Sequence, residues 1–307
     1  MTYSNFTFTD HIGMDIFVNK WVPDENTPLK GLFCIFHGMA EYSLRYDYFA
    51  KALSKAGYVC YAPDIRGHGK TIGKDGIKGS LGIDGWDGVI LDFKQLIDIM
   101  KKDYPELPVF LFGHSWGSAI VQDFMQQYGN LLSGIILSGS FGTQPLLKIS
   151  IPLSKFIIKR KGKESEAGLA YNLAIEPFNK PYKKLNIRNA WICTIPEVVT
   201  AYNDDPMCGF RPTNGFFYET SKALLRFWGT ETKIPKDLPI FIIRGNEDQV
   251  NKSGKWLLPL VKRYNKLGLK EVIYKIYPNV RHETLNDTSR DEVISDIISF
   301  LDKHVKQ

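Results

Sequence analysis

The sequence predicts an α/β fold, with a mostly parallel central sheet flanked by helices and a helical segment inserted between two parts of this core. Three observations support the prediction. Short apolar runs rich in β-branched and aromatic residues alternate with helical patterns. The alternation stops near residue 141 and resumes near residue 230. The chain has 307 residues, of which 44% are hydrophobic, and is therefore long enough for one large core that carries an insertion.

The first part of the core covers residues 1–140. Strands are expected at residues 14–21, 31–36, 58–62, 109–112 and 134–137. Helices are expected at residues 44–56, 86–104 and 115–128. Gly57 ends the first of these helices, because glycine readily adopts the conformation that closes a helix. Strands separated by helices in this way form a parallel sheet with helices on both faces.

Residues 141–229 interrupt the alternation with helical patches, scattered prolines and no clear strand pattern. A structureless loop of this length is unusual in a compact domain. We therefore expect a helical lid, or cap, over residues 141–229. The second part of the core, residues 230–307, has strand patterns at 238–244 and 272–277 and helical patterns at 252–266 and 291–303.

Composition excludes several classes of protein. No apolar run reaches the roughly 18 residues of a membrane span, and the first residues lack a signal-peptide pattern, so a cytoplasmic protein is expected. The net charge of +6 accompanies no nucleic-acid-binding motif, and no nucleic-acid partner is expected. No C-x-x-C pair or His/Cys cluster is present among the four cysteines, so we expect neither a metal nor a cofactor. Those cysteines are Cys34, Cys60, Cys193 and Cys208.

The G-x-S-x-G motif at residues 113–117 lies where a predicted strand passes into a predicted helix. A sharp turn there exposes the serine above the sheet edge and requires small neighbours where strand and helix nearly touch. The start of the following helix also favours developing negative charge. Ser115 is therefore the candidate nucleophile of an α/β-hydrolase fold.

A serine hydroxyl needs a base to accept its proton. His282 follows the last predicted strand, at the sheet edge where open α/β sheets gather their active sites, and satisfies the chain order serine, acid, histidine. His114 adjoins the nucleophile and cannot readily fold back to its hydroxyl, so we expect it to pack beneath the turn. His11 and His304 are expected to be exposed near the termini.

The acid that orients the histidine should follow a strand between Ser115 and His282. The loop after residues 238–244 offers Asp248, which we select, and Glu247 as the fallback. Two backbone N–H groups should stabilise the oxyanion, from Trp116 directly after the nucleophile and from Met39 in the loop after residues 31–36.

Several short stretches together resemble the monoacylglycerol lipase and lysophospholipase branch of the α/β-hydrolases, which includes proteins of the serine aminopeptidase (S33) type. They are HGMAEY at 37–42 with RY at 45–46, DIRGHG at 64–69, GHSWGS at 113–118, NDDP at 203–206, GNED at 245–248 and RHE at 281–283. The resemblance implies a carboxylic-ester hydrolase, acting on monoacylglycerols, lysophospholipids or related small acyl esters, with Ser115, Asp248 and His282 as its triad. Trp116 stands where the family commonly has methionine, and this bulk beside the nucleophile would narrow the pocket.

Two alternatives to the esterase remain open, an aminopeptidase-like amidase and a ligand receptor built on a hydrolase scaffold. The early lid favours the esterase over the amidase because it is mainly basic, whereas aminopeptidases of this type carry acidic groups there. Its apolar residues could contact a lipid surface, supported by nearby cations, or could pack over the cleft. These apolar residues are Leu146, Leu147, Ile149, Ile151, Leu153, Phe156, Ile157 and Ile158. The motifs specify neither the acyl chain, nor the head group, nor the oligomeric state.

Overall fold

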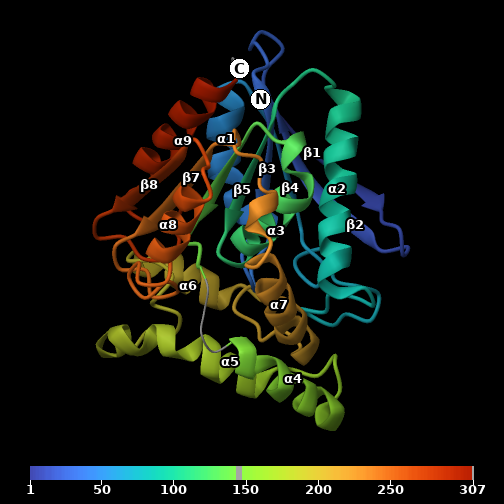
Figure 1. Ribbon diagram of the computed structural model, residues 1–307, viewed down its shortest axis with the longest axis vertical. Helices are drawn as coiled ribbons and strands as arrows, with labels where there is room; N and C mark the ends of the chain where they lie inside the picture. Colours follow the sequence, from blue (N-terminus) through green and yellow to red (C-terminus); the bar gives the residue numbers. More distant parts are fainter. Residues whose placement is uncertain (143–146, 306–307) are drawn as a thin grey trace.

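The computed structural model describes residues 1–142 and 147–305, apart from the side chain of Ile149. Its centre is an eight-stranded sheet with the order β1-β2-β4-β3-β5-β6-β7-β8 (Figure 1). The strands are β1 (Thr2–Thr9), β2 (Asp15–Val22), β3 (Gly31–Phe36), β4 (Tyr58–Pro63), β5 (Val109–His114), β6 (Gly134–Ser138), β7 (Ile240–Gly245) and β8 (Val272–Tyr277). Strand β2 pairs antiparallel with β1 and with β4, and every pair from β4 to β8 is parallel. The predicted mostly parallel sheet is confirmed.

Helices cover both faces of the sheet (Figure 1). Those of the core are α1 (Asp47–Lys55), α2 (Gly85–Asp103), α3 (Trp116–Tyr128), α8 (Leu258–Lys266) and α9 (Arg290–His304), with short 3₁₀ turns η1 (Ser43–Tyr46), η2 (Gly129–Leu131) and η4 (Glu231–Lys233). Helices α2, α3 and α8 share one apolar core, and α1 and α9 share another. Strand β3 contributes Leu32 and Phe36 to the first core and Phe33 and Ile35 to the second. Successive side chains of a strand point to opposite faces, so a strand covered on both sides reads as one continuous apolar run.

The segment between β6 and β7 contains α4 (Leu147–Lys161), α5 (Gly168–Ala174), η3 (Glu176–Leu185), α6 (Pro196–Asp204) and α7 (Asn214–Phe227). Helices α4 and α5 lie beyond one end of the sheet, at the bottom of Figure 1. Within the described part of this segment, β pairing is limited to an isolated bridge between Glu166 and Thr213. Leu146, expected at the start of the lid, lies outside the described residues. The structure thus places mainly helical elements where the sequence predicts an insertion.

One strand was not predicted, and two expectations about the elements are wrong. Strand β1 was not predicted, because its residues are mostly polar and exposed and only Phe8 is buried. Helix α8 begins at Leu258 rather than near residue 252, because the backbone φ angles are positive at residues 252–254. His304 is buried at the end of α9 rather than exposed, and its Nδ1 lies 2.7 Å from the carbonyl oxygen of Phe300.

Arg66, in the loop after β4, ties the edge of the sheet to α2. Its buried guanidinium binds Asp10 at 2.7 Å, Asp92 at 2.6 and 2.8 Å, and Asp84. Asp10, His11 and Asp92 form the one group of potential metal ligands found in the described residues. Because Arg66 already binds both carboxylates of this group, the cluster is satisfied by an internal cation and we assign no metal to it.

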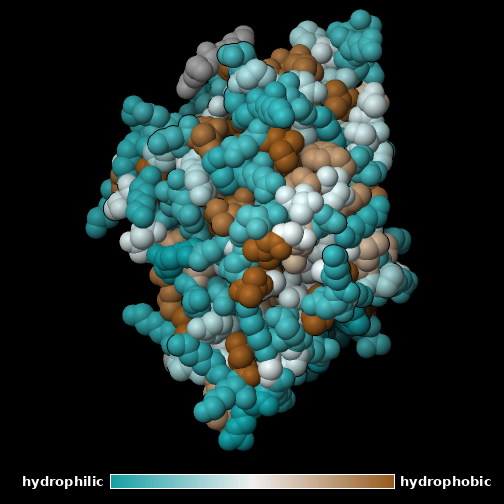
Figure 2. Space-filling model, turned by 90° about the vertical axis from the view of Figure 1, so that its right-hand side faces the viewer, coloured by the Kyte–Doolittle hydropathy of each residue, from teal (hydrophilic) through white to brown (hydrophobic). Residues whose placement is uncertain are grey.

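The surface is mixed in character. On the face drawn in Figure 2, apolar residues lie as separate patches within a mostly hydrophilic surface. Within residues 1–142 and 147–305, none of the helices combines the length and the apolar character that a membrane-spanning segment requires.

Candidate active site

Ser115 lies at the tight turn between β5 and α3. Its backbone has φ 50° and ψ −117°, a conformation that non-glycine residues rarely adopt. A Cβ atom on Gly113 would lie 2.6 Å from the carbonyl oxygen of Gly117, and one on Gly117 would lie 2.3 Å from the carbonyl oxygen of Phe36. Both flanking positions of the motif therefore require glycine, since α3 starts directly against β5 and β3.

Ser115 and His282 line the same cavity, at the edge of the sheet where the parallel strands end. The loops after β3, β5 and β8 all contribute to its wall. The lining residues are Gly38, Met39, Glu41, His114, Ser115, Trp191, Ile192, Tyr202, His282 and Glu283. Trp191, Ile192 and Tyr202 come from the inserted segment, so this segment forms one side of the cavity.

His282 and Asp248 form a buried pair beside this cavity. The Nδ1 atom of His282 lies 3.0 Å from Oδ1 of Asp248. A carboxylate can only accept, so Nδ1 is the donor of this contact, which in the neutral ring leaves the lone pair on Nε2. Among the described residues, no hydrogen-bond partner reaches Nε2, although the atom is buried. The ring thus has the tautomer that a general base requires.

Asp248 rather than Glu247 faces the histidine. Asp248 is fully buried and also accepts hydrogen bonds from the backbone N–H of Val250 at 2.9 Å and from the side chain of Asn251 at 3.0 Å. Glu247 is 41% exposed and lies 3.7 Å from the guanidinium of Arg281. The structure therefore brings His282 together with Asp248 and leaves Glu247 at the surface.

Met39 lies in the loop after β3 and Trp116 directly follows Ser115, the two positions at which the sequence predicts the oxyanion donors. Met39 lines the cavity, and Trp116 is the first residue of α3. Across the described residues, neither backbone N–H donates to another protein group. The indole of Trp116 turns toward the inserted segment, where its Nε1 donates to Thr220 at 3.0 Å and its ring packs 4.6 Å from that of Phe216. Among the described residues, Trp116 does not line the cavity that contains Ser115. The expectation that its side chain narrows the substrate pocket is therefore not supported by this cavity.

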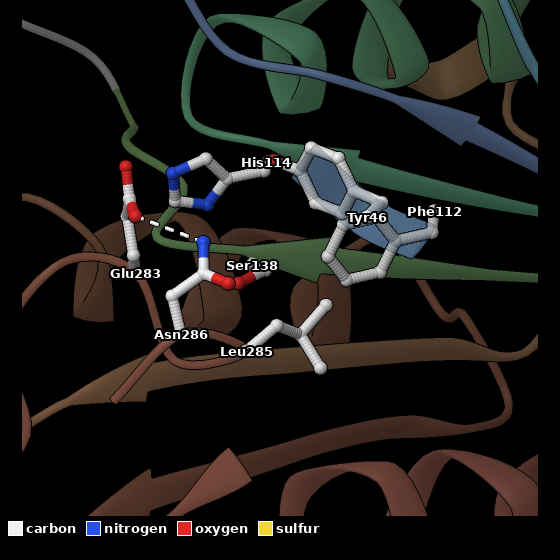
Figure 3. Close-up of a pocket in the computed structure, with 7 residues that line it drawn as sticks. All are labelled: Tyr46, Phe112, His114, Ser138, Glu283, Leu285 and Asn286. Carbon is white, nitrogen blue, oxygen red and sulfur yellow. Dashed lines mark hydrogen bonds between the residues drawn. The ribbon is translucent and has the colours of Figure 1, made fainter. Parts of the chain in front are cut away.

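His114 lies next to Ser115 in the sequence but serves the packing of the site. Its ring is buried, with its centre 4.6 Å from that of His282. Burial and the neighbouring His282 lower the pKa of His114 to about 4, so the ring is neutral near pH 7. His114 also borders a second small cavity behind the site (Figure 3), where the amide of Asn286 donates to Glu283 at 2.9 Å.

A buried network that our sequence reasoning missed holds the loop after β3. The carboxylate of Glu41 accepts from the backbone N–H of Gly38 at 2.6 Å and from the hydroxyl of Tyr46 at 2.9 Å. Arg45 binds Glu41 at 2.5 Å and binds Glu283 through two contacts of 2.9 and 2.7 Å. Burial alone would raise the pKa of Glu41, but Arg45 and nearby histidines outweigh it and lower that pKa to about 2.

This network links the loop of Met39 to the loop of His282, because Glu283 directly follows the histidine. The four-residue spacing of Glu41 and Arg45 is visible in the sequence and is a known signal for an ion pair. The third member, Glu283, is 238 positions away from Arg45 and becomes a neighbour only through the fold.

Comparison with known proteins gives a consistent relationship over nearly the whole chain. The family model of serine aminopeptidase, S33, matches residues 27–289. The chain is 28% identical to the monoacylglycerol lipase of Mycolicibacterium smegmatis over 99% of both chains. It is 27% identical to human monoglyceride lipase, over 90% of this chain and 86% of that one.

Solved structures agree with this relationship. A thermostable carboxyl esterase from Bacillus coagulans superposes with a TM-score of 0.88 at 30% identity, covering 99% of each chain. A lipase described in its open form superposes with a TM-score of 0.89 at 25% identity, covering all of both chains. These matches confirm the predicted α/β-hydrolase fold. The chain belongs to the serine aminopeptidase (S33) family of α/β-hydrolases.

Proposed function

We propose that this protein hydrolyses carboxylic esters through an acyl-enzyme, with Ser115 as nucleophile, His282 as general base and Asp248 as the orienting acid. One observation carries the proposal. The imidazole of His282 is held by buried Asp248 at 3.0 Å, leaves Nε2 without a partner among the described residues, and shares a cavity with Ser115. A base, an orienting group and a strained serine at one sheet edge are the requirements of nucleophilic acyl transfer.

The proposed reaction has two halves. The Oγ atom of Ser115 attacks the ester carbonyl carbon while Nε2 of His282 takes the hydroxyl proton. The backbone N–H groups of Met39 and Trp116 stabilise the negative charge on the carbonyl oxygen. The ester C–O bond then breaks, and His282 gives its proton to the departing alcohol oxygen. Water enters, loses a proton to His282 and attacks the acyl carbon. The bond from this carbon to Oγ then breaks, His282 returns the proton to Oγ of Ser115, and the carboxylic acid leaves.

We infer that monoacylglycerols, lysophospholipids or similar small acyl esters are the substrates. The names of the two full-length relatives, a monoacylglycerol lipase and a monoglyceride lipase, support this choice. The cavity wall is compatible with such substrates. Met39, Trp191 and Ile192 offer apolar contact, and the polar part of the wall is formed by Tyr202, Glu41 and Glu283.

An amidase that recognises a free amine is the second candidate, because Glu41 and Glu283 both reach the cavity wall. A carboxylate at that position could hold a substrate ammonium group. However, Arg45 contacts both carboxylates at 2.5–2.9 Å and supplies the positive charge that such an amine would bring. An ester substrate needs no cation-binding group. It is therefore more compatible than an amine with two carboxylates that Arg45 already pairs.

We also propose that residues 141–229 act as a lid, and that the outer surface of this lid contacts lipid. Phe156 of α4 is 56% exposed and Leu173 of α5 is 63% exposed. Exposed lysines and an arginine accompany Phe156 on α4, at residues 148, 155 and 159–161. Apolar side chains flanked by cations favour binding to an anionic interface.

Substrate class can be tested with a panel of esters and amides. We expect 1-monoacylglycerols and p-nitrophenyl esters to be hydrolysed with kcat/KM at least about 100-fold above that for aminoacyl-p-nitroanilides, because the carboxylates on the wall are already paired. Ser115→Ala serves as the blank for every substrate. A preference for the aminoacyl anilides would reverse the assignment.

The acid can be tested with a matched pair of variants. We expect Asp248→Asn to lower kcat by about 10⁴-fold, since an amide favours the wrong tautomer of the histidine. Glu247→Gln removes a neighbouring carboxylate that lies at the surface and should stay within about twofold of wild type. Steady-state hydrolysis of p-nitrophenyl butyrate measures both, and equal effects from the two changes would contradict the assignment of Asp248.

Lipid contact by the lid predicts weaker binding of Phe156→Ser to vesicles. Losing a half-exposed aromatic ring should lower the partition coefficient about tenfold on vesicles of phosphatidylglycerol and phosphatidylcholine. Leu131→Ser is a control at a solvent-exposed position outside the inserted segment, and it should bind like wild type. Cosedimentation at two salt concentrations is the measurement, and equal binding of Phe156→Ser and wild type would rule out this contact.

A further inference from the structure

Arg281, the residue before His282, binds the inserted segment through its side chain. Its Nη1 donates to the carbonyl oxygens of Ala190 and Cys193, at 2.7 Å each. Its guanidinium also lies 4.0 Å from the ring centre of Tyr182, which belongs to η3. The Arg281 side chain is only 12% exposed, so these contacts are made in a largely dry environment.

The backbone around Arg281 is held from two sides. On the core side, the carbonyl oxygen of Val280 accepts from the N–H of Glu247 at 3.0 Å. On the side of the insertion, the N–H of Glu283 donates to the carbonyl oxygen of Ile192 at 2.8 Å. His282 therefore lies in a short stretch of chain fixed between the loop of Asp248 and residues 190–193.

Residues 190–193 place an aromatic wall against the histidine. In the sequence, Trp191 lies between Ala190 and Cys193, whose carbonyl oxygens Arg281 binds. The centre of the Trp191 ring is 5.1 Å from that of the His282 ring. Trp191 also lines the cavity. From the same insertion, the hydroxyl of Tyr182 donates to the carbonyl oxygen of Glu247 at 2.8 Å, which ties the loop of Asp248 to η3.

We propose that Arg281 is a positioning residue for His282, and that it makes residues 190–193 a fixed wall of the site rather than a moving part of the lid. The inference rests on the proposed function, because it assumes that His282 is the base. Removing the guanidinium would leave the buried carbonyls of Ala190 and Cys193 without their donor. Residues 190–193 and the loop of His282 would then lose the side-chain contact that holds them together.

Lysine cannot replace this arginine fully. An ammonium group is a compact charge that does not stack on a tyrosine ring, whereas the planar guanidinium bridges two carbonyls and stacks at the same time. A displacement of about 1 Å at a reacting group can cost about 100-fold in rate. The effect should therefore appear in kcat, and a short acyl substrate that makes little contact with the lid should show it as clearly as a long one.

The test compares Arg281→Met and Arg281→Lys with Arg263→Met. Arg263 is the control, since it donates to another backbone carbonyl of the insertion, that of Trp228 at 2.6 Å, pairs with Glu231 at 2.8 Å and does not line the cavity of Ser115. With p-nitrophenyl acetate, we expect kcat to fall about 30- to 100-fold in Arg281→Met, with KM within about threefold, and to fall less in Arg281→Lys. Arg263→Met should stay within twofold of wild type.

A spectroscopic readout separates positioning from general destabilisation. The downfield proton resonance of the imidazole N–H that faces Asp248 should broaden or shift in Arg281→Met and stay unchanged in Arg263→Met. Circular dichroism and the thermal midpoint report whether each variant is folded. If Arg281→Met does not fold, the folded Arg281→Lys variant decides by the same two measurements.

Wild-type kcat and an unchanged resonance in a folded Arg281 variant would overturn the inference. That result leaves the proposed function intact provided that Ser115→Ala and His282→Ala are inactive in the same assay. Activity in those two variants would instead refute the proposed function itself. A loss of kcat in the Arg281 variants together with an altered resonance supports the positioning role.

Discussion

The close contact of strand β5, helix α3 and strand β3 around Ser115 is the constraint on which the site depends. Gly113 and Gly117 permit it, because a methyl group at either position would overlap backbone atoms at 2.6 or 2.3 Å. The contact forces Ser115 to a positive φ and directs it to the edge of the sheet. The strain is tolerated because β5 lies in the middle of a sheet that is covered on both faces.

The remaining groups of the site are brought to this edge by parallel pairing. Strands β3, β7 and β8 end on the same side as β5, and their following loops carry Met39, Asp248 and His282. Two largely buried arginines then hold these loops in place. Arg45 joins the loop of Met39 to Glu283, and Arg281 joins the loop of His282 to the inserted segment. Each guanidinium satisfies several acceptors at once, which suits it to fixing loops that have little secondary structure of their own.

Much of the core was readable from the sequence because both faces of the sheet are buried. Strands such as β3 and β5 are continuous apolar runs, and the helices between them show one apolar side. Strand β1 was not predicted because a mostly exposed edge strand carries little apolar pattern. The start of α8 was misplaced because the φ angles are positive at Lys252, Ser253 and Gly254, which keeps that stretch out of a helix. Of these three residues only Gly254 is a turn signal in the sequence.

For the site, local motifs predicted positions but not partners. The motif around Ser115 and the chain order pointed to His282, and the loop after β7 offered two adjacent carboxylates that the sequence could not rank with certainty. Geometry separates them, since Asp248 faces the imidazole and Glu247 faces Arg281. The contacts of Arg45 with Glu283 and of Arg281 with Ala190 and Cys193 join residues about 90 to 240 positions apart, and nothing in the local pattern indicates them.

The central claim is that Ser115 is the nucleophile, and covalent labelling tests it most directly. A fluorophosphonate probe should form one adduct, located by peptide mass spectrometry on the peptide that contains Ser115. The label should be lost in Ser115→Ala and strongly slowed in His282→Ala, because the hydroxyl needs its base. Labelling of another serine, or undiminished labelling of Ser115→Ala, would contradict the account.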